Sequence, residues 1–155
     1  MEKLIAPKYI FEKLPQFDVD VLAPTKRPWT TAKKHLTAID DALNINWDGY
    51  GRIFCNPMGR DSQEWLSKCS LYGDCIALTY AKTESKQFQQ IVFTHAKAVL
   101  FISGRPKFCH SDGTSTAPSP LPCVLIAFNQ NTALDLEKSG IAGKFIWLKR
   151  YSELE

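Results

Sequence analysis

Long apolar runs and secretory features are missing from this sequence of 155 residues. Its longest apolar run, at residues 123–128, is far shorter than the roughly 20 residues that a helix needs to cross a bilayer. Residues 1–15 carry charges throughout and lack the apolar segment of a signal peptide. We therefore expect a protein without a membrane partner that is located in the cytoplasm.

Cysteine chemistry is also limited, because the five cysteines are odd in number and irregularly spaced. They are Cys55, Cys69, Cys75, Cys109 and Cys123. Such a set argues against a disulfide framework, and the sequence has no Cys-x-x-Cys pair. Cys109 and His110 are the only adjacent cysteine and histidine. We expect buried free thiols and no metal, with a metal site as the alternative.

Glycine-rich phosphate loops are absent in both of their common patterns, which counts against ATP or dinucleotide binding. The three histidines show no triad or metal-ligand spacing. The net charge is only +3, with small basic clusters at residues 26–27, 33–34 and 149–150. This charge permits contact with nucleic acid but does not require it.

Apolar periodicity predicts short strands that alternate with helices. The expected strands are residues 17–22, 52–55, 74–79, 98–102, 122–128 and 144–148, and the expected helices or helical turns are residues 7–14, 31–43, 62–69, 84–94 and 131–139. Residues 107–122 read as a long polar loop. The alternation implies right-handed crossovers. We therefore predict an α/β fold: a single compact Rossmann-like domain over residues 1–155, with a mostly parallel sheet and helices on both faces.

The stretch at residues 52–60 ends a short apolar strand in the sequence Asn-Pro-Met-Gly. Ligands of open α/β sheets bind beyond the carboxyl ends of strands, so chemistry is expected at this point. The amide of Asn56 and the main-chain carbonyls beside Pro57 would form a rigid set of hydrogen-bonding groups. A plain turn is the alternative, since Asn, Pro and Gly dominate turns.

Further motifs follow one another in a specific order along the chain. They are Ala-Pro-Lys-Tyr-Ile-Phe at residues 6–11, Val-Asp-Val-Leu-Ala at 19–23, Asp-Ala-Leu at 41–43 before Trp47, Cys-Asn-Pro-Met-Gly at 55–59, Tyr-Ala-Lys-Thr-Glu-Ser-Lys-Gln-Phe at 80–88, Ile-Ser-Gly-Arg-Pro-Lys-Phe at 102–108 and Ala-Pro-Ser-Pro at 117–120. In this order, over residues 6–128, the chain resembles the Dam-like DNA N6-adenine methyltransferases of bacteriophages and prophages.

The resemblance implies a domain that binds S-adenosylmethionine and transfers its methyl group to adenine N6 in double-stranded DNA, in the cytoplasm of a bacterial host. Asn56 and Pro57 are the implied catalytic residues. The Asn side-chain oxygen and the carbonyl of the following Pro accept hydrogen bonds from the N6 amino group, which favours its electron-rich form. The base must leave the duplex, and an aromatic side chain stacks on it.

The resemblance also implies binding residues. Those for the cofactor are Pro7, Asp20, Ala23, Asp40, Asp41 and Asn56. Those for DNA are Met58, Lys82, Arg105 and Lys107. The alternatives are a solvated strand end for Asp20, a plain helix surface for Asp40 and Asp41, and a solvated loop for Arg105 and Lys107.

The chain departs from the family pattern in ways that affect function. Met58-Gly59 stands where the family has Pro-Tyr-Gly, so the stacking aromatic is missing. Trp65 is a candidate substitute, although a tryptophan inside a helix more often belongs to the core. Lys82 replaces an arginine and Ala6 a threonine. The alternatives are a catalytically impaired protein that binds DNA, cofactor or another protein without turnover, and an unrelated α/β domain with a coincidental Asn-Pro turn.

Overall fold

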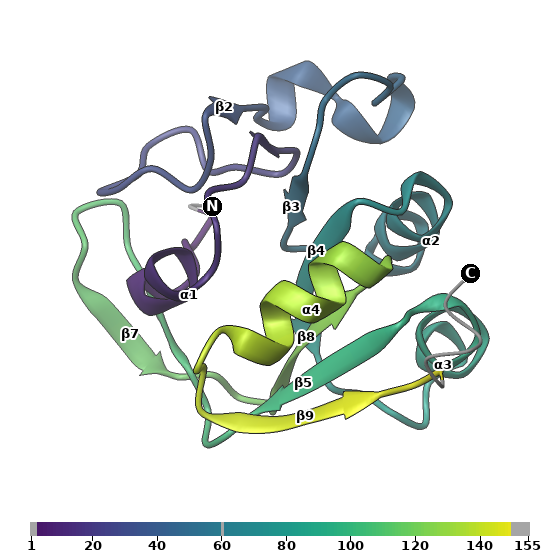
Figure 1. Cartoon of the computed structure of the whole chain (residues 1–155). Helices are drawn as coiled ribbons and strands as arrows, with labels where there is room; N and C mark the ends of the chain where they lie inside the picture. The colour runs from purple at the N-terminus through teal and green to yellow at the C-terminus, as the bar shows by residue number, and fades with distance from the viewer. Residues whose placement is uncertain (1–2, 60, 150–155) are drawn as a thin grey trace.

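The computed structural model describes residues 3–59 and 61–149, so Arg60 and Arg150 of the patterns above lie outside the described residues. Its main sheet has seven strands in the order β2-β1-β3-β4-β8-β5-β9 (Figure 1). They are β1 (Val19–Asp20), β2 (Lys34–His35), β3 (Ile53–Cys55), β4 (Cys75–Tyr80), β5 (Ala98–Ile102), β8 (Cys123–Ala127) and β9 (Gly143–Trp147). The strand that precedes the Asn-Pro motif, β3, is therefore an interior strand between β1 and β4.

The sheet is mixed, and the prediction of a mostly parallel sheet is only partly right. β2, β1, β3 and β4 are parallel neighbours, whereas β8 is antiparallel to β4 and β5, and β9 is antiparallel to β5. The cause is the connection from β5 to β8, which is an antiparallel hairpin of β6 (Lys107–Cys109) and β7 (Ser115–Pro118). Without a crossover helix, the chain returns beside β5 in the opposite direction. The long loop predicted at residues 107–122 is largely this hairpin.

Helices lie on both faces of the sheet (Figure 1). α1 (Lys8–Lys13) and α4 (Gln130–Lys138) pack against one face. α2 (Ser62–Tyr72) and the π-helical segment η3 (Phe88–Val92), which continues into α3 (Phe93–His95), cover the other face. Both faces of the central strands are thereby removed from water, which explains their continuous apolar sequences.

The helical turn predicted within residues 31–43 is present, but only in the second half of that segment. The segment forms strand β2, followed by two short 3-10 turns, η1 (Ala38–Asp40) and η2 (Ala42–Asn44). Asp41, between the turns, has left-handed dihedral angles with φ at 51°. Because this conformation cannot continue a right-handed helix, the helical pattern stops after one turn.

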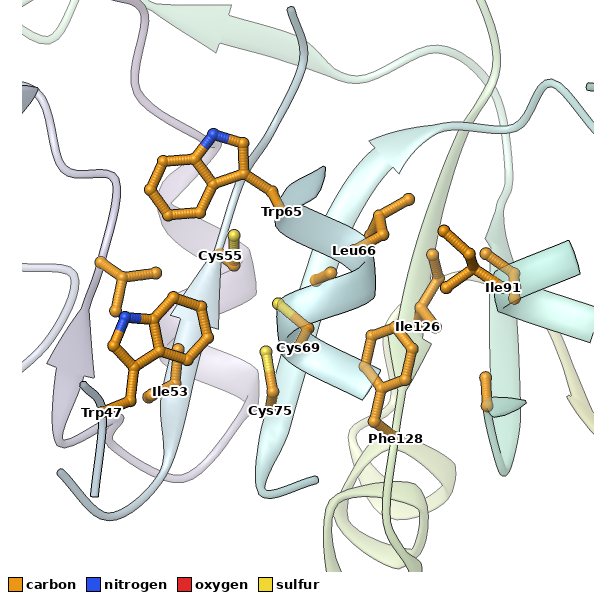
Figure 2. Packing of buried hydrophobic residues seen from close by; sticks show 14 of the residues in the cluster. Trp47, Ile53, Cys55, Trp65, Leu66, Cys69, Cys75, Ile91, Ile126 and Phe128 are labelled. Carbon is orange, nitrogen blue, oxygen red and sulfur yellow. The ribbon is translucent and has the colours of Figure 1, made fainter. Parts of the chain in front are cut away.

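The core beneath α2 contains two tryptophans and three cysteines (Figure 2). Trp47 stacks on Trp65, with ring centroids 6.3 Å apart, so Trp65 belongs to the core. Cys55, Cys69 and Cys75 are buried free thiols, as are the remaining two cysteines of the chain. Burial raises the pKa of the Cys55 and Cys69 thiols well above the ordinary value, so these thiols stay neutral.

Replacement of Gly143 by alanine should destabilise the protein, because a Cβ there would overlap the main-chain oxygen of Phe101 on β5. Gly140→Ala is the matched control, since Gly140 also has a positive φ (74°) but open space around it. The control should lose about 1–2 kcal/mol in free energy of unfolding. Gly143→Ala should lose at least about 1 kcal/mol more in urea denaturation. Equal losses would contradict the close pairing of β9 with β5.

Candidate active site

Asn56 lies directly after β3, at the edge of the sheet where the carboxyl ends of β1, β3 and β4 meet. Its side chain is buried, with the residue 4% exposed, yet its Oδ1 has no hydrogen-bond partner among the residues that the structure describes. A buried acceptor left without a donor costs roughly 1–3 kcal/mol. An oxygen held at this expense is suited to receive a hydrogen bond from a ligand.

The main-chain carbonyl of Pro57 follows this amide and is held by the neighbouring strand. Buried Thr79 of β4 donates a hydrogen bond from its Oγ1 to this carbonyl oxygen at 3.0 Å. The parallel register of the two strands, with Cys55 opposite Ala77, brings the two residues side by side. Since a carbonyl oxygen has two lone pairs, that of Pro57 can accept a second donor.

A cavity of about 370 Å³ lies in front of Asn56; we call it the acceptor cavity. Met58, Tyr80 at the end of β4, and Phe108 of β6 line it, together with residues of β7 and the loop that follows. The hairpin therefore forms one wall, and the edge of the sheet forms the other. Two aromatic side chains and one unpaired amide oxygen suit a flat, mostly apolar ligand that carries a hydrogen-bond donor.

A second cavity, of about 460 Å³, lies at the carboxyl end of β1; we call it the β1 cavity. Leu22, Ala23 and Pro24 line it from the chain after β1, and Ala38 of η1 and Ser111 of the hairpin complete its wall. Its volume falls within the range of small-molecule sites, about 300–1,000 Å³. The chain therefore has room for two ligands at one edge of the sheet.

Lys3 lines both the acceptor cavity and the β1 cavity. Its Nζ donates a hydrogen bond to the main-chain oxygen of Asn56 at 3.1 Å. The segment that carries it is fixed by a bridge between Ile5 and Cys109 of β6, with two main-chain hydrogen bonds of 2.9 Å. Burial lowers the pKa of Lys3, and the charge of Asp20 works against this change.

Asp20, at the end of β1, is only 2% exposed and points inward. Its Oδ2 accepts a hydrogen bond from Thr31 Oγ1 at 2.5 Å, and its Oδ1 accepts one from the N–H of Leu22 at 3.0 Å. Burial raises the pKa of Asp20 to about 6, although these two bonds and the charge of Lys3 oppose the rise. These bonds stabilise a turn directly after Asp20, so β1 ends at Asp20 and not at residue 22 as predicted. The Asp20 side chain lines a small interior cavity of about 10 Å³.

The other residues assigned to the cofactor differ in their positions. Ala23 lines the β1 cavity. Pro7 is buried immediately before α1, outside the lining of both cavities. Asp40 and Asp41 are exposed and accept hydrogen bonds within their own turns, at 2.7 Å and 3.0 Å. The structure thus brings Ala23 and Asn56 to the cavities, but not Pro7 or the two aspartates.

The basic residues assigned to DNA lie at the same edge of the sheet as Asn56. Lys82 follows β4, and Arg105 and Lys107 follow β5, which runs in the same direction as β4. All three are exposed, and Arg105 donates a hydrogen bond to the carbonyl of Pro120 at 2.9 Å. Exposed cations beside a cavity are the arrangement that contacts a phosphate backbone.

Lys3, Tyr80 and Phe108 were not predicted as site residues from the sequence. Both aromatic residues do lie in the motifs that carry the resemblance. Tyr80 could have been identified because it ends β4, the strand that pairs with the strand before Asn56. Lys3 has no comparable signal, because its position depends on pairing with a hairpin far along the chain. Trp65, the candidate substitute for the missing aromatic, lines a separate cavity of about 230 Å³ that also borders Met58.

These features define an α/β protein with two adjoining cavities at the carboxyl ends of its strands. A family model, Dam: DNA N-6-adenine-methyltransferase (Dam), matches residues 4–138. The chain therefore belongs to this family of adenine-specific DNA methyltransferases. Comparison with curated proteins and with solved structures finds no match.

Methyltransferases of this family use S-adenosylmethionine, and the β1 cavity has a volume in the range of small-molecule sites. No helix within residues 3–59 and 61–149 is long and apolar enough to cross a membrane. Over the same described residues, no group of three or more metal-ligand side chains comes together. The described residues of the site are an amide, main-chain carbonyls, two aromatic rings and the half-buried side chain of Lys3.

The inward carboxyl of Asp20 should make stability depend on pH. Its pKa is raised to about 6 in the folded protein and lies near 3.9 in an unfolded chain, so the folded form binds the proton more tightly. This contribution is complete below about pH 4 and is lost as the pH rises through about 6. The side chain of Asp20→Asn cannot ionise, so this variant does not lose that contribution. Its free energy of unfolding minus that of wild type should therefore increase by about 2–3 kcal/mol from about pH 4 to pH 7. Urea denaturation at both pH values measures this gain.

Asp18→Asn provides a control of opposite sign. The hydrogen bond from the N–H of Arg52, the largest effect, holds the pKa of Asp18 below its ordinary value. Its contribution is therefore present above the unfolded pKa and is lost as the pH falls. Relative to wild type, the Asp18 variant should lose stability as the pH rises, whereas the Asp20 variant should gain it. A difference for Asp20→Asn that does not change with pH would contradict this account of the buried carboxyl.

Proposed function

We propose that this protein transfers a methyl group from S-adenosylmethionine to the N6 amino group of adenine in double-stranded DNA. The observation that carries the proposal is the buried Oδ1 of Asn56, which has no partner among the described residues. It lies next to the carbonyl of Pro57, which can accept a second hydrogen bond. Two acceptors side by side match the two N–H donors of an exocyclic amino group.

The chemistry asks the protein to make a weak nucleophile available. The lone pair of an adenine amino nitrogen is delocalised into the ring, so the nitrogen attacks only when this delocalisation is reduced. When bound, the cofactor supplies an electrophilic methyl group. Asn56 Oδ1 and the Pro57 carbonyl accept hydrogen bonds from the amino group as positive charge develops on it, and they are already fixed in place. Thr79 holds the Pro57 carbonyl in position.

The acceptor cavity supports recognition of a base that has left the duplex. Tyr80 and Phe108 line it from the sheet and from the hairpin, and Met58 contributes a thioether. Aromatic rings hold an extruded base by stacking, and an amide reads its edge. Tyr80 thus supplies from β4 the aromatic that the Asn-Pro-Met-Gly sequence lacks.

The residues around the two cavities complete the proposal. Ala23 forms part of the cofactor wall, and Asp20 acts on that wall through the turn that it stabilises. Lys82, Arg105 and Lys107 contact the phosphate backbone beside the acceptor cavity. On the strength of the resemblance, we place this activity in bacteriophage or prophage DNA modification within the bacterial cytoplasm.

A second candidate function is binding of DNA and cofactor without turnover. The specific observation in its favour is Met58, which holds the position next to the Asn-Pro pair where the family has an aromatic. A thioether contacts a base more weakly than an aromatic face does. Methyl incorporation into DNA that contains unmethylated adenine distinguishes the two functions. Binding without incorporation would favour the second.

Removal of the amide should abolish most of the turnover. Asn56→Ala should lower methyl incorporation into unmethylated genomic DNA by on the order of 10²–10³, the usual cost of one preorganised hydrogen-bonding group. Binding to DNA should persist and should fall steeply with salt, since it depends on Lys82, Arg105 and Lys107. Asn131→Ala, at an exposed position of α4, is the control and should keep the wild-type rate. Unchanged incorporation by Asn56→Ala would show that the site is assigned to the wrong residue.

Tyr80 should matter through its ring rather than its hydroxyl. Tyr80→Leu removes stacking that contributes roughly 1–3 kcal/mol per base, so the rate at a fixed DNA concentration should fall about ten- to a hundred-fold. Tyr80→Phe keeps the ring and should stay within about threefold of wild type. Steady-state methylation kinetics of the two variants measure the effect. Equal rates for both would exclude Tyr80 as the stacking residue.

A further inference from the structure

The polar lining of the acceptor cavity consists mostly of hydrogen-bond acceptors. Asn56 Oδ1 has no partner among the described residues, and the carbonyl of Pro57 lies beside it. Thr116 and the buried Ser119 also line the cavity, and their hydroxyl groups donate to main-chain carbonyls at 3.0 Å and 2.8 Å. A hydroxyl whose proton is used in this way offers only its lone pairs to a ligand. The cavity is therefore suited to a ligand that brings its own donors.

Adenine and cytosine both match this lining. Each carries an exocyclic amino group next to a ring nitrogen that accepts a hydrogen bond, and Lys3, which also lines the cavity, has N–H donors for that nitrogen. Guanine and thymine carry a carbonyl oxygen at the corresponding position, and its lone pairs would face those of Asn56 Oδ1. The cavity therefore distinguishes an amino group from a carbonyl oxygen.

The same lining reads little of the rest of the base. A side-chain amide commonly identifies adenine by bonding to N6 and to N7 of its second ring. Asn56 is the only side-chain amide among the described residues of the lining, and the amino group uses its oxygen. The opposite wall, from Phe108 to Ala117 and Pro120, offers apolar contacts. Apolar contacts discriminate between ligands that differ in size by only about 10–200-fold.

Met58 makes this cavity adaptable to ligands of different size. It stands where the family has an aromatic residue, and it lines both the acceptor cavity and the neighbouring cavity that contains Trp65. A thioether side chain is flexible and fills irregular gaps, whereas an aromatic ring has a fixed shape. The departure from the family pattern therefore leaves room for either a one-ring or a two-ring base at Asn56.

We propose that this site also methylates the N4 amino group of unpaired cytosine in DNA, and that Met58 permits this second substrate. The inference rests on the proposed function, because it uses the same acceptors and the same methyl donor. The lone pair of N4 forms a bond to the methyl carbon, the carbon–sulfur bond breaks with its electron pair left on sulfur, and N4 loses one proton to water. The cytosine is unpaired because extruding a base costs least when it has no partner.

Duplexes with one isotope-labelled cytosine or adenine opposite an abasic position test the proposal. After incubation with S-adenosylmethionine and digestion to nucleosides, chromatography with mass spectrometry measures labelled N4-methylcytosine and N6-methyladenine. The wild-type protein should form N4-methylcytosine about 10–200-fold more slowly than N6-methyladenine. Asn56→Ala should lower both rates by on the order of 10²–10³, and the control Asn131→Ala should keep both. Met58→Phe should widen the gap between the two bases by at least about tenfold.

Binding provides a second readout that needs no turnover. Without cofactor, the protein should bind DNA with an unpaired cytosine about tenfold more tightly than DNA with an unpaired thymine at the same position. The reason is that the carbonyl of thymine leaves Asn56 Oδ1 without a donor. Asn56→Ala should remove this difference, and Asn131→Ala should keep it. Fluorescence anisotropy with the two duplexes measures the effect.

The outcomes separate this inference from the proposed function. N6-methyladenine without N4-methylcytosine overturns the inference and leaves the proposed function standing, whereas the absence of both products overturns both. N4-methylcytosine that forms at an unchanged rate in Asn56→Ala also overturns the inference, because it then arises at another site. An unchanged gap between the bases in Met58→Phe shows that the role of Met58 is wrong. If thermal unfolding shows that Met58→Phe is not folded, Met58→Tyr takes its place.

Discussion

The parallel register of β1, β3 and β4 is the constraint on which the rest of the site depends. Val19 lies opposite Ile53, which in turn lies opposite Cys75, so the three strands run in step. Because parallel strands present their carboxyl ends at the same edge, the turn containing Ala23 and the amide of Asn56 are brought together from distant parts of the chain. A slip of one residue would exchange the two faces of a strand and would separate these groups.

Periodicity was sufficient for the elements that are buried on both faces, such as Ala98–Ile102, whose bounds the sequence predicted. The direction of a strand could not be predicted in the same way. The apolar run of Cys123–Ala127 would have the same sequence pattern whether it ran parallel or antiparallel to its neighbours. The hairpin within residues 107–122 was missed because β7 is mostly exposed and carries no apolar alternation. The helical turn predicted within residues 31–43 is interrupted at Asp41 by a left-handed conformation that local sequence patterns do not reveal.

For the site, the local pattern of a strand that ends in Asn-Pro led to Asn56, and the resemblance to the family led to Ala23. It could not show that Asp20 turns inward, since alternation gives the face of a side chain but not its hydrogen-bond partners. Lys3 and Phe108 were beyond local patterns altogether. Their positions depend on pairing between the first residues of the chain and a hairpin about a hundred residues later.

The bridge between Ile5 and Cys109 has a consequence for how such a protein can change over evolution. The hairpin that forms a wall of the acceptor cavity also fixes the segment that carries Lys3. An insertion or deletion in the hairpin would therefore alter the shape of the acceptor cavity and the position of Lys3 at the same time. The wall of the acceptor cavity and the lysine that lines both cavities are therefore coupled, and neither can change over evolution without affecting the other.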